Sequence, residues 1–279
     1  MMIGVRAHDY GKKLPIDLFT DIANDGWKTV QLAIPKAIEG IDSFDDVTPE
    51  IVSEIKSAMS ISGVGVAVLG VYVDPALIDE AKRKEQVKFL LQALPQAKML
   101  GAGCVGTETS VRGENADIKA LYCSLEEILP EAERLGVKLG IEPVHRHTLC
   151  TPELTKQMLR DFSSSSLKII FDPLNLLTPE TIITQDDLWK RSLDCFGEHI
   201  VAIHMKGATG ELDSNGMLSD APFKSSILDH KALFGKFKYL SAPILREGAL
   251  PAEAANDIEF IKTELKKSGL KAPPVHYPI

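Results

Sequence analysis

The sequence is poor in cysteine, and the few cysteines that it has are far apart. Cys104, Cys123, Cys150 and Cys195 form no Cys-x-x-Cys pair. Zinc ribbons, zinc fingers and thioredoxin-like redox sites need closely spaced cysteines, and small secreted scaffolds need many of them. The pattern therefore excludes these classes and predicts four reduced thiols in a cytoplasmic protein.

The sequence also lacks long apolar runs, a leader-like N-terminus and an excess of positive charge. No stretch approaches the roughly 18 uninterrupted apolar residues of a membrane span. The first ten residues lack the charged region and apolar core of a signal peptide. A net charge of −8 disfavours nucleic acid or an anionic membrane as the main partner. We therefore expect a cytoplasmic protein whose partner is a small molecule.

What the sequence does contain is a strict alternation of strand-like and helix-like segments. The predicted strands are Met2–Val5, Thr29–Ala33, Val64–Val71, Cys104–Thr107, Val137–Ile141, Leu167–Phe171, His199–Ile203 and Ala242–Arg246. The predicted helices are Pro15–Asn24, Pro49–Ser60, Pro75–Leu100, Ala116–Leu135, Pro152–Asp161, Pro179–Phe196, Ile227–Phe237 and Pro251–Lys267. Alternation of this kind calls for a parallel sheet, and eight such units in 279 residues fit a closed (β/α)8 TIM barrel better than an open sheet.

Three local features qualify this prediction. Prolines predict a break near Pro95 and a start or kink near Pro130. The segment Gly207–Ser226 is rich in Gly, Asn, Asp and Ser, and we predict an irregular, mobile lid over the barrel mouth. No linker composition is present, so we expect a single domain over residues 1–279, with 272–279 as an extended tail along the surface or a neighbouring subunit of a homo-oligomer.

Four of the predicted strands end on a side chain that can bind a metal or transfer a proton. These residues are Glu142, Asp172, His204 and Glu247, and the intervals between them are 30, 32 and 43 residues. A βα unit takes about 30 residues, so the surplus in the last interval is the predicted lid. Because the carboxyl ends of barrel strands form one face, we expect the four side chains to converge there.

This set of side chains suggests a metal site. Two glutamates, one aspartate and one histidine are hard ligands that suit one divalent ion, Mn²⁺, Mg²⁺, Co²⁺ or Zn²⁺, and do not suit copper or an iron–sulfur cluster. Taken alone, Asp172 is at least as well explained as a turn carboxylate before Pro173, and His204 as a hydrogen-bonded core histidine. The occurrence of all four at equivalent strand ends favours the metal.

The same motifs resemble those of the xylose isomerase-like TIM barrels. This family contains the sugar phosphate isomerases and epimerases, inosose dehydratases and the AP endonuclease family 2 group with endonuclease IV. The resemblance rests on Ile141-Glu142-Pro143, Phe171-Asp172-Pro173, His204-Met205-Lys206 and Arg246-Glu247-Gly248. It implies that Glu142, Asp172, His204 and Glu247 bind the metal.

Several further polar or aromatic residues follow predicted strands and are expected at the same face. We predict that the substrate contacts His8, Tyr72, Glu108, His145, Asn175 and Lys206. Structural roles remain open for some of them, since Tyr72 is consistent with stacking on a sugar or covering the barrel mouth. Asn175 stands where many relatives have a histidine, and it can bond a substrate oxygen but cannot transfer protons at neutral pH.

The resemblance implies a divalent-metal-dependent sugar or sugar-phosphate isomerase or epimerase of carbohydrate metabolism. Proton transfer would pass through an enediolate, with Glu142 and Glu247 as the catalytic bases. The alternatives are an inosose dehydratase-like lyase at the same site and a non-catalytic sugar-binding barrel. DNA repair is disfavoured, because Asp229 and His230 are adjacent where endonuclease IV has Asp-x-His, and because the net charge is negative.

Overall fold

Eight parallel strands close into a barrel in the computed structural model, which describes residues 1–113 and 115–269. Around the barrel their order is β1-β10-β7-β6-β5-β4-β3-β2. Their bounds are β1 Ile3–Arg6, β2 Thr29–Leu32, β3 Gly65–Gly70, β4 Cys104–Glu108, β5 Leu139–Glu142, β6 Leu167–Phe171, β7 Ile200–Met205 and β10 Ile244–Arg246. The predicted (β/α)8 TIM barrel is confirmed, and the predicted tail 272–279 lies outside the described residues.

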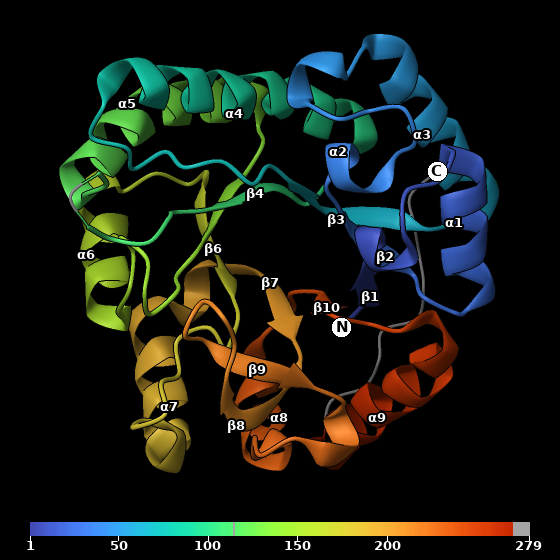
Figure 1. Ribbon diagram of the computed structural model, residues 1–279, viewed down its shortest axis with the longest axis vertical. Coiled ribbons are helices and arrows are strands. Elements are labelled where there is room, and N and C mark those ends of the chain that lie inside the picture. The colour runs from blue at the N-terminus through green and yellow to red at the C-terminus, as the bar shows by residue number, and fades with distance from the viewer. Residues whose placement is uncertain (114, 270–279) are drawn as a thin grey trace.

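Helices form a ring around these strands (Figure 1). Their bounds are α1 Pro15–Asn24, α2 Ile34–Ala37, α3 Pro49–Ser62, α4 Glu80–Leu100, α5 Ile118–Leu135, α6 Pro152–Phe162, α7 Gln185–Phe196, α8 His230–Lys236 and α9 Ala254–Lys267. Capping residues define several helix starts: the Thr48 side chain accepts from the amide of Ile51 before α3, and the Asp79 side chain accepts from the amide of Lys82 before α4. Among the described residues, no helix is long and apolar enough to cross a membrane.

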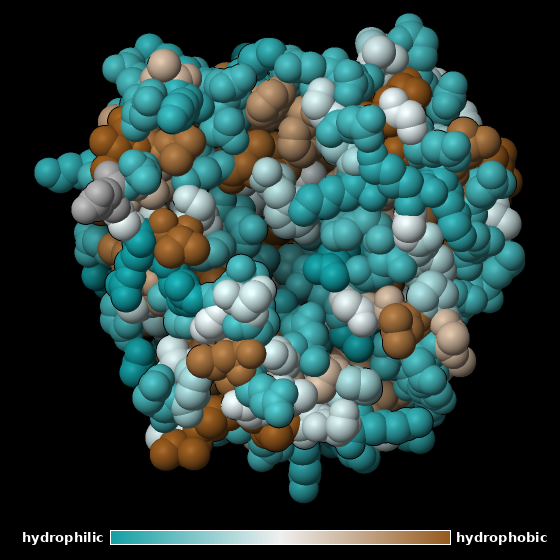
Figure 2. Space-filling view, in the orientation of Figure 1, coloured by the Kyte–Doolittle hydropathy of each residue, from teal (hydrophilic) through white to brown (hydrophobic). Residues whose placement is uncertain are grey.

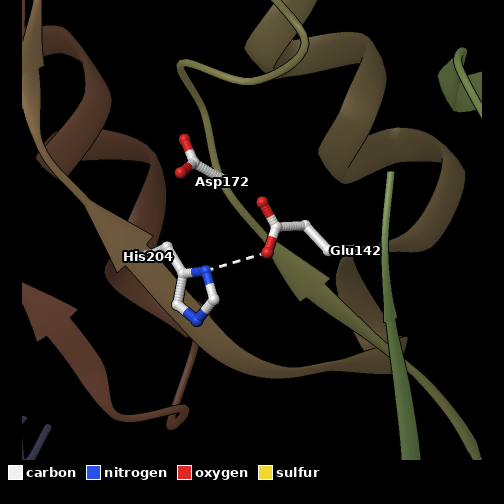
Figure 3. Close-up of side chains that lie close together, drawn as sticks. All are labelled: Glu142, Asp172 and His204. Atoms are coloured by element: carbon white, nitrogen blue, oxygen red, sulfur yellow. Dashed lines mark ion pairs between the residues drawn. The ribbon is translucent and has the colours of Figure 1, made fainter. Parts of the chain in front are cut away.

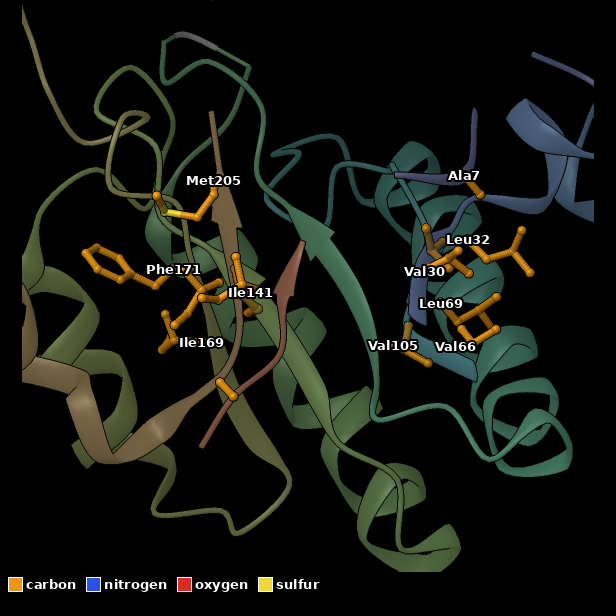
Figure 4. Close-up of a cluster of buried hydrophobic side chains, with 14 of the residues drawn as sticks. Ala7, Val30, Leu32, Val66, Leu69, Val105, Ile141, Ile169, Phe171 and Met205 are labelled. Carbon is orange, nitrogen blue, oxygen red and sulfur yellow. The ribbon is translucent and has the colours of Figure 1, made fainter. Parts of the chain in front are cut away.

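Successive side chains along each strand point alternately out of and into the barrel, so the apolar residues form an outer core and an inner core. Outward-facing residues such as Val30, Leu32, Val105, Ile141 and Phe171 pack in the main hydrophobic cluster (Figure 4). Inward-facing residues form a smaller cluster inside the barrel: Ala67, Val68, Cys104, Ile170, Ala202 and Leu245. The polar residues at the strand ends therefore sit above an apolar plug, which closes the barrel below them.

The predicted break near Pro95 is wrong and no helix starts at Pro130, whereas the predicted kink near Pro130 stays a prediction. Pro95 lies inside the continuous helix α4, and Pro130 lies inside α5. A proline in a helix loses one backbone hydrogen bond, at a cost of about 3 kcal/mol. Both helices continue past their proline, and apolar residues on both sides of it are buried, including Leu94 and Ala97 in α4.

Several helices begin later than predicted, because local turns replace their first residues. Residues 75–79 form no helix, and α4 begins at Glu80 after the capping Asp79. Before α7, the hydroxyl and backbone groups of Thr178 and Thr181 bond each other. A 3-10 turn precedes α9 at Pro251–Glu253. In each case polar side chains or proline geometry favour a turn over the first helical turn.

The predicted irregular segment Gly207–Ser226 is instead largely an antiparallel hairpin. Strands β8 (Gly207–Leu212) and β9 (Leu218–Ala221) pair in a separate two-stranded sheet, drawn over the lower half of the ring in Figure 1. Asp213 stabilises the turn, since its Oδ1 accepts from the amides of Asn215 and Met217. The Gly, Asn and Asp residues of the segment Gly207–Ser226 therefore reflect the turn that a hairpin needs.

Candidate metal centre

The carboxyl ends of adjacent barrel strands bring the predicted ligands together. Glu142 is the last residue of β5, Asp172 directly follows β6, and His204 lies near the end of β7. One ligand atom from each of these three residues lies within 4.8 Å of the others, and all three residues are buried (Figure 3). The predicted convergence is confirmed for these three residues.

Glu247, the fourth predicted ligand, follows β10 and contacts the same histidine. The Nδ1 atom of His204 lies 2.9 Å from Oε2 of Glu142 and 3.3 Å from Oε1 of Glu247. The histidine therefore faces one carboxylate on the β5 side and another on the β10 side. All four predicted residues lie in one buried cluster.

The donor atoms fit a divalent ion. Asp172 Oδ2 and His204 Nδ1 are buried, and the groups that face them are charged: Lys206 lies 3.1 Å from Oδ2, and Glu142 lies 2.9 Å from Nδ1. Three carboxylate groups buried around one imidazole nitrogen are costly without compensating positive charge, and a divalent cation would supply it. Three carboxylates and one imidazole are also the ligand types that Mn²⁺, Mg²⁺ and Zn²⁺ accept in proteins.

The turn after β6 fixes the orientation of Asp172. Its Oδ1 accepts hydrogen bonds from the backbone amides of Leu174 (2.8 Å) and Asn175 (3.1 Å). The two interpretations from sequence, turn carboxylate and metal ligand, are therefore compatible, since the turn uses Oδ1 while Oδ2 lies 3.1 Å from Nζ of Lys206 in the cluster. Burial raises the pKa of Asp172 to about 6, with Glu142 and Glu247 adding to the rise and Lys206 opposing it.

Lys206 and Arg6 balance part of the negative charge. Lys206 Nζ lies 3.1 Å from Oδ2 of Asp172 and 3.1 Å from Oε2 of Glu247. Arg6 lies 3.8 Å from the same Oε2 atom. Burial opposes ionisation of Glu247, but His204, Lys206 and Arg6 outweigh it and lower the pKa of Glu247 well below its usual value. The carboxylate of Glu247 is thus held in its charged form.

The histidine responds to the same charges in the opposite direction. Burial lowers the pKa of His204, but Glu247 and Glu142 outweigh this effect and raise it to about 9. The site therefore attracts positive charge strongly, and a proton on the imidazole is one way to supply it. A metal ion would compete with that proton, as it does at any histidine ligand.

Asn175 contacts the cluster itself. Its side-chain amide donates a hydrogen bond of 2.5 Å to Oε1 of Glu142. The backbone carbonyl of Asn175 lies 3.2 Å from Nδ1 of His145, which is half-buried behind it. The predicted substrate contacts of Asn175 and His145 remain predictions, and the structure adds an orienting bond to Glu142.

Tyr72 and His8 contact each other, with basic and amide side chains around the tyrosine. Their rings meet edge to face at 6.3 Å, and Lys36 Nζ lies 3.9 Å from the centre of the Tyr72 ring. Gln31 donates a hydrogen bond to the Tyr72 hydroxyl. Burial lowers the pKa of His8 to about 4, with Arg6 and Lys36 adding to the effect, so its imidazole is neutral at pH 7.

Sequence reasoning missed Gln31. This residue is 2% exposed inside β2, where the rest of the strand is Thr29, Val30 and Leu32. A polar amide within an apolar strand was the signal that could have identified it, because a buried amide needs a partner. The partner is the hydroxyl of Tyr72.

Glu108 stands beside Glu142 in the barrel wall. The two residues are paired in register between β4 and β5. Burial, together with Glu142 and Glu247, raises the pKa of Glu108 to about 7. His147 Nδ1 lies 3.9 Å from Oε2 of Glu108. The predicted role of Glu108 in substrate binding remains a prediction.

Known structures share this architecture over nearly the whole chain. A D-tagatose 3-epimerase-like protein superposes with a TM-score of 0.77 at 18% identity, covering 96% of this chain and 98% of that one. A xylose isomerase-like TIM barrel protein from Mycobacterium smegmatis in complex with magnesium gives 0.74 at 14% identity, covering 96% and 97%. The 3-keto-D-glucoside 4-epimerase from E. coli superposes with a TM-score of 0.72 at 18% identity, and the match covers 94% of this chain and 99% of that one. At these identities the likeness shows the fold alone.

The sequence itself identifies the family. No protein of curated function matches the chain. The pattern of the xylose isomerase-like TIM barrel family, however, matches residues 19–264, which include Glu142, Asp172, His204 and Glu247. With the closed parallel barrel and the buried acidic cluster at its strand ends, the chain belongs to the xylose isomerase-like TIM barrel family.

Proposed function

We propose that the protein is a divalent-metal-dependent isomerase or epimerase of a sugar or sugar phosphate, acting by proton transfer through an enediolate. The observation that supports this most directly is the position of His204 Nδ1 between two buried glutamates, 2.9 Å from Glu142 and 3.3 Å from Glu247. Two carboxylates around one metal-competent cluster allow a proton to be removed from carbon on one face and returned on the other.

Four side chains would hold the ion: Glu142, Asp172, His204 and Glu247. When bound, the ion would supply a Lewis acid that chelates neighbouring substrate oxygens and stabilises negative charge on them. Lys206 would keep Asp172 and Glu247 ionised, since its ammonium lies 3.1 Å from both carboxylates. Asn175 would keep Glu142 oriented through its 2.5 Å hydrogen bond.

In this proposal Glu142 and Glu247 move the proton. They reach the cluster from β5 and β10, on two sides of His204, so they can approach opposite faces of one substrate carbon. Removal by one and return by the other inverts the carbon, which is epimerisation. Return to the adjacent carbon interconverts ketose and aldose.

The polar opening of the site supports a carbohydrate as the substrate. The surface is hollowed at the centre of the helix ring, and hydrophilic residues line the hollow (Figure 2). The Tyr72 ring with Lys36 and His8 beside it, and the carboxyl group of Glu108, would offer donors and acceptors for hydroxyl groups. Among structural neighbours, a D-psicose 3-epimerase was solved with D-fructose, and an L-ribulose 3-epimerase shares the fold.

A lyase is the second candidate, because a probable 3-DHS dehydratase has the same barrel with a TM-score of 0.72. Loss of a β-hydroxyl from the same enediolate would give dehydration. The two reactions differ in their products. Isomerisation and epimerisation conserve the mass of the sugar, whereas dehydration lowers it by one water.

The test is a panel of ketoses and aldoses, free and phosphorylated, followed by NMR in D₂O with added Mn²⁺, Mg²⁺, Co²⁺ or Zn²⁺. We expect deuterium to enter beside the carbonyl, or a new isomer to form, and EDTA to abolish both. Glu247→Gln keeps the shape of the side chain but cannot accept a proton, so turnover should fall on the order of 10²–10⁴-fold. Glu153→Gln, an exposed glutamate outside the cluster, is the matched control.

Three outcomes would contradict the proposal. Native turnover by Glu247→Gln would show that Glu247 is a bystander. Metal content that is unchanged in Asp172→Ala would remove Asp172 from the ligand set. Binding of sugars without exchange or product across the whole panel would favour the non-catalytic barrel.

A further inference from the structure

A second cavity lies at the other end of the barrel from the metal cluster. Its volume is about 480 Å³, and it lies between α6, the start of β6 and the segment before β7. Lys168 in its wall is the second residue of β6 and precedes Asp172, just after that strand, by four residues, which is roughly 13 Å of strand rise. The residues that line it are Lys156, Leu159, Arg160, Ser163, Ser164, Ser165, Lys168, Cys195 and His199.

The charge of this lining is entirely positive. Lys156, Arg160 and Lys168 supply three cations, and no carboxylate lines the cavity. None of these three side chains has a hydrogen bond or ion pair with any residue in 1–113 or 115–269. By contrast, Lys13, Lys88 and Arg191 each form an ion pair with a carboxylate.

The cations also repel one another. Lys156 and Lys168 are half-buried, so solvent screens their charges only in part. Burial lowers the pKa of Lys168, and the neighbouring Lys138 adds to the effect. Unpaired positive charges held together in a concave site are stabilised when an anion enters, and this is the arrangement that proteins use to bind phosphate.

Two acidic residues near the cavity already have partners, and Asp194 and Glu198, which flank Cys195 and His199, form no ion pair with the three cations within the part of the chain that the structure describes. Glu133 Oε1 accepts from the Ser164 hydroxyl at 2.5 Å, and Glu153 forms an ion pair with Arg191 at 3.2 Å. The hydroxyl of Ser163 donates to the carbonyl of Arg160. The cations are therefore left for a ligand from solution, with serine hydroxyls beside them that can donate or accept.

We infer that this cavity binds the phosphate group of a small molecule, at a site separate from the metal cluster. Its volume falls within the range of small-molecule pockets, roughly 300–1,000 Å³, and exceeds the space that a phosphate ion needs. The buried Leu159 and the half-buried Cys195 add an apolar wall that suits the organic part of a phosphate monoester. Bound there, the ligand would link α6 to the first residues of β6 and to the segment that precedes β7.

The experiment is isothermal titration calorimetry with inorganic phosphate and, separately, glycerol phosphate, at constant ionic strength. The double variant Lys156→Gln/Arg160→Gln should weaken binding at least tenfold. The control Lys119→Gln/Lys190→Gln removes two exposed lysines from other helices and should bind as the native protein does. Tighter binding of glycerol phosphate would identify a monoester as the ligand, and equal or weaker binding would identify free phosphate.

Two readouts separate this site from the metal cluster and from a folding defect. Native affinity should persist in EDTA and in Asp172→Ala, and both double variants should melt within a few degrees of the native protein without ligand. The inference would be overturned by the absence of heat at millimolar ligand, by equal affinity in the cavity variant, or by loss of binding in EDTA. None of these results depends on whether the protein isomerises sugars.

Discussion

The side-chain amide of Asn175 donates a 2.5 Å hydrogen bond to Oε1 of Glu142. The backbone amide of the same asparagine donates to Oδ1 of Asp172 at 3.1 Å. One residue therefore orients two carboxylates of the candidate metal centre. The bond leaves Oε2 of Glu142 directed at His204, 2.9 Å from Nδ1.

Asn175→Ala should weaken the metal centre without removing any ligand. Glu142 would lose the donor that fixes its carboxylate, and loss of such an outer partner typically lowers metal affinity or activity about 10–100-fold. Metal titration followed by elemental analysis measures the metal affinity, and the sugar panel measures the activity. Asn256→Ala is the control, because Asn256 is an exposed residue of α9 whose side chain bonds Glu253, away from the cluster. Equal affinity in both variants would show that Asn175 does not support the site.

The site residues at the strand ends were predictable, because side chains alternate between the inside and the outside of a barrel and the strand ends form one face. Residues that alternate along β5, β6 and β7 face the same interior, so Glu142, Asp172 and His204 meet although 30 or more residues separate them in sequence. Nothing further than the alternation and the strand ends was required. The barrel and this part of the site therefore followed from pattern alone.

Interactions between distant residues were not predictable in the same way. Turn residues marked Gly207–Ser226 as irregular, yet the segment pairs with itself as β8 and β9. Pro95 signalled a break, yet α4 continues past it, with apolar residues buried on both sides. The bond from Asn175 to Glu142 depends on the turn after β6, which brings residue 175 back toward β5. Each of these outcomes depends on a contact with another part of the chain, which the local sequence pattern does not identify.

The β8–β9 hairpin should be the first site of limited proteolysis. At its tip, Arg146 from the loop after β5 lies so close to Gly216 that a Cβ there would be 2.3 Å from Nη1. Asp213 at the same turn carries the opposite charge. We expect cleavage within residues 207–226, slower cleavage with bound sugar, and faster cleavage in Arg146→Ala. Arg112→Ala is the control, since Arg112 lies next to the same loop but contacts Cys150. Unchanged cleavage with every bound sugar would make the hairpin an ordinary surface element.

The barrel interior should not tolerate a side chain at Gly106. A Cβ at this position would lie 2.4 Å from Cγ1 of Val68 and 2.8 Å from Cδ1 of Ile170. Gly106→Ala should therefore destabilise the protein by about 1–3 kcal/mol through overpacking. Gly235→Ala is the matched control: it lies in α8 with open space around it, and alanine favours helix by roughly 0.5–1 kcal/mol. Urea denaturation measures the stability of both variants, and equal unfolding midpoints for Gly106→Ala and Gly235→Ala would contradict the packing argument.

His230 should make the fold sensitive to acid at a distance from the metal centre. The residue is 7% exposed, lies edge-on to the rings of Phe223 and Phe260, and has no hydrogen bond to its ring nitrogens among the described residues. Burial lowers its pKa to about 4, and Arg246 adds to the effect while Glu264 opposes it. An unfolded histidine has a pKa near 6.5.

The sign of the effect follows from these two values. Between about pH 6.5 and 4 the unfolded state binds more protons than the folded state, so stability falls as the pH falls through that window. At pH 5 the free energy of unfolding is lower than at pH 8 by on the order of 1–2 kcal/mol because of this one group.

His230→Phe keeps an aromatic ring against Phe223 and Phe260 but cannot bind a proton. Thermal melts should show a smaller drop in Tm from pH 8 to pH 5 for the variant, by several degrees. The melts at pH 8 serve as the internal control for packing, because both proteins are neutral there at this position. Parallel pH profiles for the two proteins would show that His230 is protonated in the folded state without cost.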